Sequence, residues 1–220
     1  MLMSILKKKQ HKVSFFCFFL VTMKFLTFTD LHENREGLKA LVKRASEVDI
    51  DFVVCAGDIS SFGRGLRVVL KAFNEVGKPF YVVPGNHEEG PGFEEVVGEF
   101  PHCISLDRKA TMIGDYIFLG FGGGGFAMKD ADFRKLARFW YGKFNGQRIV
   151  LLTHQPPFAT KLDALNDRHV GNEDFRDFIV RIKPRLAISG HLHETVGEVD
   201  VMGDTKLINP GWDGMVIELK

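Results

Sequence analysis

The sequence predicts an α/β fold within a single domain, on the evidence of its composition, its alternating apolar patterns and its lack of internal divisions. The chain has 220 residues, of which 45% are hydrophobic and 26% charged, so it can bury a full core. From Met23 onward, short β-rich runs alternate with segments whose apolar residues recur at helical spacing. No linker, repeat or low-complexity tract interrupts this alternation. We therefore expect an N-terminal extension over residues 1–22 and one domain over residues 23–220.

The expected strands are short, apolar and rich in β-branched or aromatic residues. The early strand–helix–strand units predict parallel pairs joined by crossovers, and the closely spaced later strands predict antiparallel pairs. In chain order the strands are residues 25–29, 52–56, 80–83, 116–121, 149–153, 186–189, 205–208 and 215–219.

Between these strands, apolar residues at helical spacing predict four helices. Pro184 is expected to end the last of them, because proline disrupts a helix interior. The stripes are Leu38, Leu41, Val42, Ala45 and Val48 for the first helix and Leu66, Val69, Leu70 and Phe73 for the second, and the last two helices cover residues 133–144 and 175–182.

The N-terminal extension is rich in lysine up to Lys12 and apolar over residues 13–21. The uncharged stretch between Lys12 and Lys24 is far shorter than the ~20 residues that cross a bilayer, so we expect no membrane span. Three interpretations stay open: translation that starts at Met23, an apolar extension that packs on the protein, and a secretory signal. The domain from Met23 onward is the same in all three.

Charge and cysteine content exclude two further classes of protein. The chain has 29 basic and 28 acidic residues, but the lysines of the extension leave the domain slightly acidic. Because nucleic-acid binding depends on basic side chains that neutralise phosphates, we expect no generic nucleic-acid binding. The three cysteines, Cys17, Cys55 and Cys103, form no CxxC pair, which predicts the reducing cytoplasm rather than a disulfide framework.

Five of the expected strands are followed by residue types that bind metal ions. In α/β folds the carboxyl ends of strands come together, so side chains far apart in sequence can share one cavity. Two carboxylates, one amide oxygen and four imidazoles exceed what one ion binds and suit two divalent ions. Nitrogen and oxygen donors without thiolate favour manganese, iron, zinc, nickel or cobalt. In chain order the candidate ligands are Asp30, His32, Asp58, Asn86, His154, His191 and His193.

Each of these motifs also has a structural interpretation when it is considered alone. A Gly-Asp or Gly-Asn-His segment after a strand is typical of a turn. A histidine such as His154 is often a hydrogen-bonded core residue. Taken together, in this order and each at the end of a strand, the motifs indicate a metal centre.

The five blocks resemble the signature of the calcineurin-like metallophosphoesterases, in particular the small single-domain prokaryotic members. They are Asp30-x-His32, Gly57-Asp58, Gly85-Asn86-His87-Glu88, His154 and Gly190-His191-x-His193. Two further segments, His169-Val170-Gly171 and Asn209-Pro210-Gly211, are similar to secondary motifs of that group. The resemblance implies a four-layer αββα sandwich, in which helices flank two mixed β-sheets and a dimetal site lies at the strand ends.

The resemblance also implies a ligand set for each ion, with Asp58 as the bridge. The first ion would bind Asp30, His32, Asp58 and His193, and the second would bind Asp58, Asn86, His154 and His191.

The implied activity is that of a metal-dependent phosphoesterase. A hydroxide that two ions share attacks phosphorus in line, and the ions offset charge on the phosphoryl oxygens. His87 is not needed as a ligand, so it is the candidate catalytic residue, as proton donor or electrostatic stabiliser at the leaving oxygen. Glu88 is expected either to orient His87 or to be a solvated turn residue.

The expected partner is a small phosphate-ester substrate, either a phosphomonoester or a phosphodiester. The natural substrate, the native metals and the oligomeric state, a homo-oligomer included, stay open. A non-catalytic scaffold is the alternative function, and the complete ligand set and His87 argue against it. A metallo-β-lactamase-type site needs the motif His-x-His-x-Asp-His. The chain has His191-x-His193 but continues with Glu194-Thr195, so this motif is incomplete.

Two segments outside the five blocks are candidates for a supporting role. The glycines at 122–125 are expected to form either a flexible turn or a backbone cradle for a phosphate oxygen. They lack the Lys-Ser/Thr of a P-loop, which excludes nucleotide triphosphate binding by that motif. The prolines after His154 are expected to stiffen a loop at the rim of the site, where Phe158 and His169 pack on the surface or contact substrate.

Overall fold

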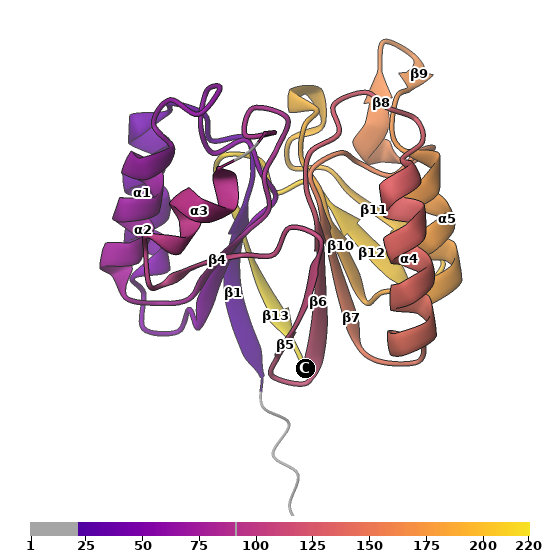
Figure 1. Ribbon diagram of the computed structural model, residues 1–220, viewed down its shortest axis with the longest axis horizontal. Helices are drawn as coiled ribbons and strands as arrows, with labels where there is room; N and C mark the ends of the chain where they lie inside the picture. Colours follow the sequence, from indigo (N-terminus) through magenta and orange to yellow (C-terminus); the bar gives the residue numbers. More distant parts are fainter. Residues whose placement is uncertain (1–21, 91) are drawn as a thin grey trace, which may run out of the picture.

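The computed structural model describes residues 22–90 and 92–220, whose helices and strands form four layers (Figure 1). Two β-sheets lie against each other, and helices cover the outer face of each sheet. The expected α/β sandwich of two mixed sheets is confirmed. Except for Thr22, the expected extension lies outside the described residues.

The first sheet has the strand order β13-β1-β2-β3-β4. Strands β1 to β4 are parallel to one another, and β13 pairs with β1 in the antiparallel direction. Helices α1, α2 and α3 cover its outer face. The bounds are β1 (Met23–Phe28), α1 (Arg35–Ala45), β2 (Phe52–Cys55), α2 (Leu66–Val76), β3 (Phe80–Val82), α3 (Phe93–Gly98), β4 (Cys103–Ser105) and β13 (Met215–Leu219).

The second sheet has the strand order β11-β12-β10-β7-β6-β5. Its four inner strands are parallel, and the two edge strands, β11 and β5, are antiparallel to their neighbours. Helices α4 and α5 cover its outer face, and the β8–β9 hairpin rises above it. The bounds are β5 (Lys109–Ile113), β6 (Tyr116–Phe121), α4 (Ala131–Phe144), β7 (Ile149–Thr153), β8 (Ala164–Leu165), β9 (Arg168–His169), α5 (Glu173–Ile182), β10 (Leu186–Ile188), β11 (Val199–Met202) and β12 (Thr205–Ile208), with 3₁₀ turns at Lys161–Asp163 and His193–Thr195.

Apolar side chains fill the three interfaces between the four layers. Strand β1 contributes side chains to two of these interfaces, because successive side chains of a strand point to opposite faces of the sheet. Phe25 belongs to the cluster between the sheets, whereas Leu26 and Phe28 belong to the cluster under α1 and α2. The third cluster joins α4 and α5 to the second sheet around Phe133 and Phe175.

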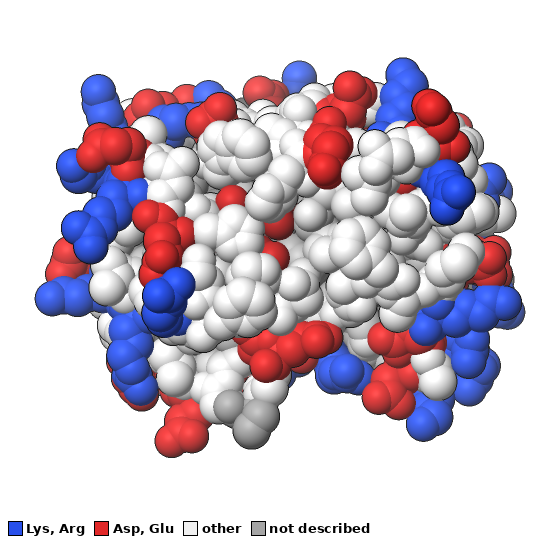
Figure 2. Space-filling view, turned by 90° about the horizontal axis from the view of Figure 1, so that it is seen from above, with Lys and Arg blue, Asp and Glu red and all other residues white. Residues whose placement is uncertain are grey.

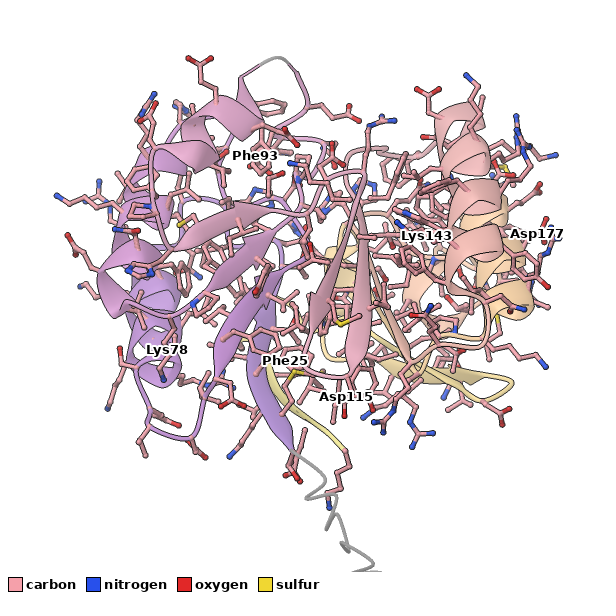
Figure 3. The ribbon with its side chains drawn as sticks, turned by 60° about the horizontal axis from the view of Figure 1, so that its bottom comes forward. Phe25, Lys78, Phe93, Asp115, Lys143 and Asp177 are labelled. Atoms are coloured by element: carbon pink, nitrogen blue, oxygen red, sulfur yellow. The ribbon has the colours of Figure 1, made fainter. Side chains whose placement is uncertain are left out.

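Aromatic packing holds the two sheets together. The ring of Phe25 stacks on that of Phe52 with centroids 4.9 Å apart and meets the ring of Phe118 edge-on at 5.9 Å. Figure 3 shows Phe25 between the two sheets, whereas Asp115 and Asp177 lie at the outer surface. This apolar centre keeps the strand ends of both sheets at a fixed separation.

The structure corrects several of the predicted elements. Helix α1 ends at Ala45, so Val48 is 99% exposed and does not extend the buried stripe. Strand β12 is parallel to β10, contrary to the antiparallel pairing expected of the later strands. The sequence patterns also missed α3, β4, β5 and β11, which are short or lie at sheet edges. Edge strands have one exposed face or side, so their apolar pattern is weak.

Among the described residues, no helix has the length and apolar character needed to cross a bilayer. The two described cysteines, Cys55 and Cys103, are buried free thiols. Burial raises the pKa of Cys103 to about 12, so this thiol stays protonated and acts as a small apolar core residue.

Candidate metal centre

The loops that follow β1, β2, β3, β7 and β10 meet at one end of the sandwich, the upper end in Figure 1. Within each sheet these strands are parallel, so their carboxyl ends lie at the same edge. Seen from above, this face has acidic side chains recessed between uncharged ones at its centre (Figure 2). The structure brings all seven predicted ligands and His87 together at this end.

Four of the predicted ligands have a left-handed backbone conformation that is uncommon for residues with a side chain. The φ angles are 53° at Asp30, 49° at His32, 51° at Asp58 and 71° at His191. Such conformations cost of order 1–3 kcal/mol each and persist where the surrounding structure holds them. Here each one turns the chain after a strand, and the side chains meet in the ligand groups described below.

Asp30, His32 and His193 form the first ligand group, in which one atom of each residue lies within 4.8 Å of the others. The Nε2 atoms of His32 and His193 face each other at 3.2 Å, and His193 Nε2 lies 3.7 Å from Asp30 Oδ1. The backbone N–H of His191 donates to both oxygens of Asp30. This contact links the loops of the two sheets directly.

Asp58, His154 and His191 form the second ligand group. His154 Nδ1 donates a hydrogen bond to the carbonyl oxygen of Ala56 at 2.8 Å, which leaves Nε2 directed into the site. Nε2 lies 3.4 Å from Asp58 Oδ2 and 3.0 Å from Asn86 Oδ1. Asn86 therefore joins this group, as the sequence predicted from its position after β3.

Electrostatic contacts within the second group shift the pKa of each member. Burial alone would raise the pKa of Asp58, but the hydrogen bond and charge of His154 lower it. Burial alone would lower the pKa of His154, but Asp58 raises it to about 9. Burial and the nearby charge of His154 lower the pKa of His191 to about 4. His191 is therefore neutral near pH 7 and can bind a cation, whereas a cation at His154 has to displace a proton.

A third group, formed by His32, Asp58 and His87, connects the other two. His87 Nε2 lies 3.9 Å from Asp58 Oδ2, and the backbone N–H of His87 donates to Asp58 Oδ1 at 2.9 Å. His32 is thus common to the first and third groups, and Asp58 is common to the second and third. The three groups form one continuous cluster.

The residues fit divalent metal ions on two observations. The Nε2 atom of His191 is buried and has no hydrogen-bond partner among the described residues, a state that metal coordination would relieve. The donor set consists of imidazole nitrogens and carboxylate or amide oxygens, which suits first-row divalent ions.

Glu88 has a role that the sequence analysis missed. The side chain is only 7% exposed, so it is not a solvated turn residue. Its Oε2 accepts hydrogen bonds from the backbone N–H groups of Asp58 and Gly85, and its Oε1 accepts from the N–H and hydroxyl of Ser60. Its hydrogen bonds therefore join the ligand loops after β2 and β3, and none of them goes to His87. Its position in the Gly85-Asn86-His87-Glu88 block was the available signal.

Asn209 supports the turn that carries His193. Its buried side chain donates to the carbonyl of Leu192 and to Thr195 Oγ1, and accepts from the N–H of Gly211. The Asn-Pro-Gly segment noted in the sequence thus orders a ligand loop without contributing a ligand.

The glycines at 122–125 form a loop that leads into a turn, and three of their four backbone N–H groups are already bonded within the protein. The N–H groups of Gly122, Gly123 and Gly124 donate to Asp107, to the Pro84 carbonyl and to Glu89, respectively. A Cβ atom at Gly122 would collide with Pro84. The structure therefore supports the turn interpretation over a phosphate cradle. At the rim, Phe158 and His169 pack on each other, with ring centroids 5.7 Å apart.

Comparison with protein families decides the classification. The family model for calcineurin-like phosphoesterases matches residues 23–195. The chain belongs to this family. The calcineurin-like phosphoesterases are metal-dependent hydrolases of phosphate esters, which agrees with the resemblance carried by the five sequence blocks.

Relatives of this phosphoesterase occur in archaea and bacteria. An uncharacterised protein of Methanocaldococcus jannaschii, MJ1162, is 31% identical over 204 residues, covering 86% of this chain and 88% of the relative. A probable glycerophosphodiester phosphodiesterase of Arcobacter nitrofigilis, GpdQ, is 25% identical over 157 residues, covering 65% and 56%. The crystal structure of the Thermus thermophilus protein TT1561 superimposes with a TM-score of 0.70 at 17% identity, covering 87% and 91%. This structural likeness shows a shared fold.

Proposed function

We propose that this phosphoesterase uses two divalent metal ions, bridged by Asp58, to hydrolyse small phosphomono- or phosphodiesters. The observation that carries the proposal is the position of Asp58, whose carboxylate belongs to two ligand groups at once. One oxygen lies near both His154 and His87, and the same carboxylate forms a group with His32. A carboxylate shared in this way supports a two-ion centre over a single-ion site.

In this proposal the first ion binds Asp30, His32, Asp58 and His193, and the second binds Asp58, Asn86, His154 and His191. The chemistry that two bound ions would supply is a hydroxide near neutral pH, suited to in-line attack on phosphorus, and positive charge that would offset the phosphoryl oxygens.

Residues that are not ligands orient the proposed ligands through hydrogen bonds. Ala56 fixes the tautomer of His154, and Glu88 joins the loops of Asp58 and Asn86. Such supporting contacts typically contribute about 10–100-fold to metal affinity or activity.

His87 is proposed to act at the leaving oxygen, as a proton donor or an electrostatic stabiliser. Its side chain is 23% exposed, and its Nε2 lies at the edge of the cluster near Asp58. This position supports contact with a substrate bound over the ligands. The third group, in which His87 shares atoms with His32 and Asp58, makes a ligand role the competing assignment.

Metal reconstitution tests the proposed activity. Metal-depleted protein is loaded separately with manganese, iron(II), zinc, nickel and cobalt, and the metal content per chain is measured beside hydrolysis of bis(4-nitrophenyl) phosphate and 4-nitrophenyl phosphate. We expect two ions per chain and hydrolysis of at least one ester with at least one metal. Full activity with one ion per chain would exclude the two-ion proposal, and no hydrolysis with two bound ions would exclude the esterase activity on these substrates.

Replacement of His87 by alanine separates its two assignments. We expect two ions to remain bound while kcat falls by about 10²–10⁴-fold, the usual contribution of general acid–base catalysis. If His87 donates a proton, an alkyl ester should lose more rate than a nitrophenyl ester, because nitrophenolate leaves without one. Equal losses would favour electrostatic stabilisation, and loss of metal would show that His87 is a ligand.

A further inference from the structure

Three aromatic side chains pack on histidines of the metal cluster, outside the three apolar clusters of the core. They come from three loops, which follow β2, β6 and β12. Each therefore lies directly beside the proposed metal centre. The pairs and the distances between their ring centroids are Phe62–His87 at 4.1 Å, Phe126–His191 at 4.6 Å and Trp212–His193 at 5.9 Å.

Two of these rings are largely exposed to solvent. Phe62 is 77% exposed and Phe126 is 60% exposed. The ring of Phe62 is inclined by only 22° to that of His87, so one face of Phe62 covers the histidine and the opposite face is open. Exposed apolar side chains gathered around a polar site are typical of a ligand-binding surface.

The backbone conformation at Phe62 indicates that phenylalanine does not stabilise the turn in which it lies. Ser61 and Arg64 exchange two backbone hydrogen bonds of 3.1 Å, and the two residues between them have φ angles of 52° at Phe62 and 79° at Gly63. Two central residues with positive φ are the pattern of a type I′ turn, which strongly prefers Asn-Gly. A phenylalanine in the first position is strained, as is typical of residues held for binding or catalysis.

The charge around the cluster favours a substrate of low charge. The ion-pair partners of Asp30 and Asp58 are histidines, and within the described part of the chain no lysine or arginine pairs with either carboxylate. Figure 2 shows uncharged side chains around the recessed acidic ones, whereas the lysines and arginines lie farther out. The basic residue of the Phe62 turn, Arg64, lies 3.7 Å from Glu33, so its charge is already paired and is not free for the second negative charge of a phosphomonoester.

We propose that the preferred substrate is a phosphodiester with a planar aromatic ester group, which Phe62 and Phe126 bind beside the metal centre; this inference rests on the proposed function. The open face of Phe62 offers a flat surface, and rings in contact prefer stacked or edge-on geometries. In an aryl phosphate ester, a single oxygen atom separates phosphorus from the aromatic ring of the substrate. The same ligand can therefore contact the ligand cluster and the aromatic side chains together.

Binding of phosphinates tests the inference without hydrolysis, since these monoanions have no ester bond. Diphenylphosphinate, dicyclohexylphosphinate and dimethylphosphinate are titrated into the manganese-loaded protein by calorimetry. We expect diphenylphosphinate to bind about 3- to 10-fold more tightly than either of the others. Equal affinity for all three would overturn the inference. Equal affinity for the phenyl and cyclohexyl compounds would overturn its aromatic part.

Two variants show whether the named rings carry this preference. Phe62→Asn should remove most of the preference for diphenylphosphinate while Tm stays unchanged or rises, because asparagine suits the turn. Phe126→Leu should reduce the preference at unchanged metal content. Phe139→Leu is the control, since Phe139 is 59% exposed on α4 and should leave the preference intact. A preference that survives the Phe62 and Phe126 changes would overturn the assignment.

Hydrolysis of esters with one common leaving group separates this inference from the proposed function. The substrates are 4-nitrophenyl phenyl phosphate, 4-nitrophenyl methyl phosphate and 4-nitrophenyl phosphate. Nitrophenolate leaves from all three, so they differ only in the group that stays on phosphorus, which is the group we expect on Phe62 and Phe126. We expect the highest kcat/KM when that group is phenyl. Hydrolysis without a phenyl preference would overturn the inference and leave the proposed function standing. Selective binding of diphenylphosphinate without hydrolysis of any ester would overturn the proposed function and leave the aromatic binding surface standing. A preference for the monoester would overturn the phosphodiester part.

Discussion

Two buried carboxylates, Glu88 and Asp163, organise different loops at the same end of the molecule. Glu88 is 7% exposed and accepts hydrogen bonds from the N–H groups of Asp58, Ser60 and Gly85. Asp163 is fully buried and accepts from the N–H groups of Ala159, Thr160 and Gly171. Each side chain therefore satisfies several backbone donors that would otherwise be buried without a partner.

The two carboxylates differ in how close their hydrogen bonds lie to the proposed ligands: the bonds of Glu88 reach a ligand or its neighbour, and those of Asp163 lie five or more residues from His154. The loops held by Glu88 contain Asp58 and adjoin Asn86, both proposed ligands. The loops held by Asp163 surround the β8–β9 hairpin at the rim (Figure 1), and its side chain also accepts from His169 Nδ1 at 2.8 Å. His169 is not in any of the three ligand groups.

A buried carboxylate with the same local chemistry therefore has different consequences in different loops. Loss of Glu88 should displace ligands, so metal affinity should report it. Loss of Asp163 should loosen the rim, so stability should report it.

Asp58→Asn should have the largest effect, because a neutral amide cannot bridge two cations as a carboxylate does. We expect both sites to weaken, total metal to fall well below two ions per chain, and activity to fall by at least about 10²-fold. Metal analysis after gel filtration, with His193→Ala as the matched variant, checks this result. His193→Ala should deplete mainly the first site, and two ions in Asp58→Asn would show that Asp58 is not a bridge.

Glu88→Gln should lower metal affinity by about 10–100-fold, the typical effect of losing a group that orients ligands. The glutamine NH₂ would face the N–H groups of Asp58 and Gly85, or those of Ser60, and repel them. Competition with a fluorescent chelator measures the affinity. Unchanged affinity would mean that the ligand loops keep their shape without Glu88.

Asp163→Asn should lower the free energy of unfolding by about 1–3 kcal/mol, because an amide leaves buried N–H donors without an acceptor. Metal affinity should change by less than about threefold, since His154, the proposed ligand at the start of the Ala159–Thr160 loop, is held by its own hydrogen bond to Ala56. Urea unfolding and the same chelator assay give both quantities. A large loss of metal affinity would remove the distinction between the two carboxylates.

A chain that begins at Met23 should show the smallest effect of all. Strand β1 begins at Met23, and the family match also begins there. We expect Tm, metal content and kcat/KM to match those of the full chain. An insoluble or inactive product would show that the apolar residues before Met23 pack on the domain or mediate an oligomer contact.

Local patterns were sufficient to predict the main strands, the four long helices and the residues at the strand ends. Strands 116–121, 149–153, 205–208 and 215–219 agree with the structure at both ends. Strands β6 and β7 are buried along their whole length, so their apolar runs are easy to recognise. The polar residues after β1, β2, β3, β7 and β10 were predicted to converge because parallel strands place their carboxyl ends together.

Other features depended on long-range contacts that no local pattern records. The local sequence around Glu88 is compatible with a solvated turn residue, yet its partners lie up to 30 residues away. The glycine segment at 122–125 is locally compatible with a phosphate cradle, but the N–H groups of Gly122, Gly123 and Gly124 are bonded to Asp107, Pro84 and Glu89.

The sequence alone therefore determined which chemistry-bearing residues follow which strand, because hydrophobic periodicity and strand ends are local properties. Only the tertiary structure decided how Asp58 is shared among ligand groups, which carboxylate supports which loop, and that Phe62 packs on His87 with one face open. The grouping of Asp58 with His154 and His191 depends on the packing of the two sheets against each other, which brings residues about a hundred or more positions apart into contact. The contacts of Glu88 and Phe62 depend on the pairing of neighbouring strands, which places the loops after β2 and β3 side by side.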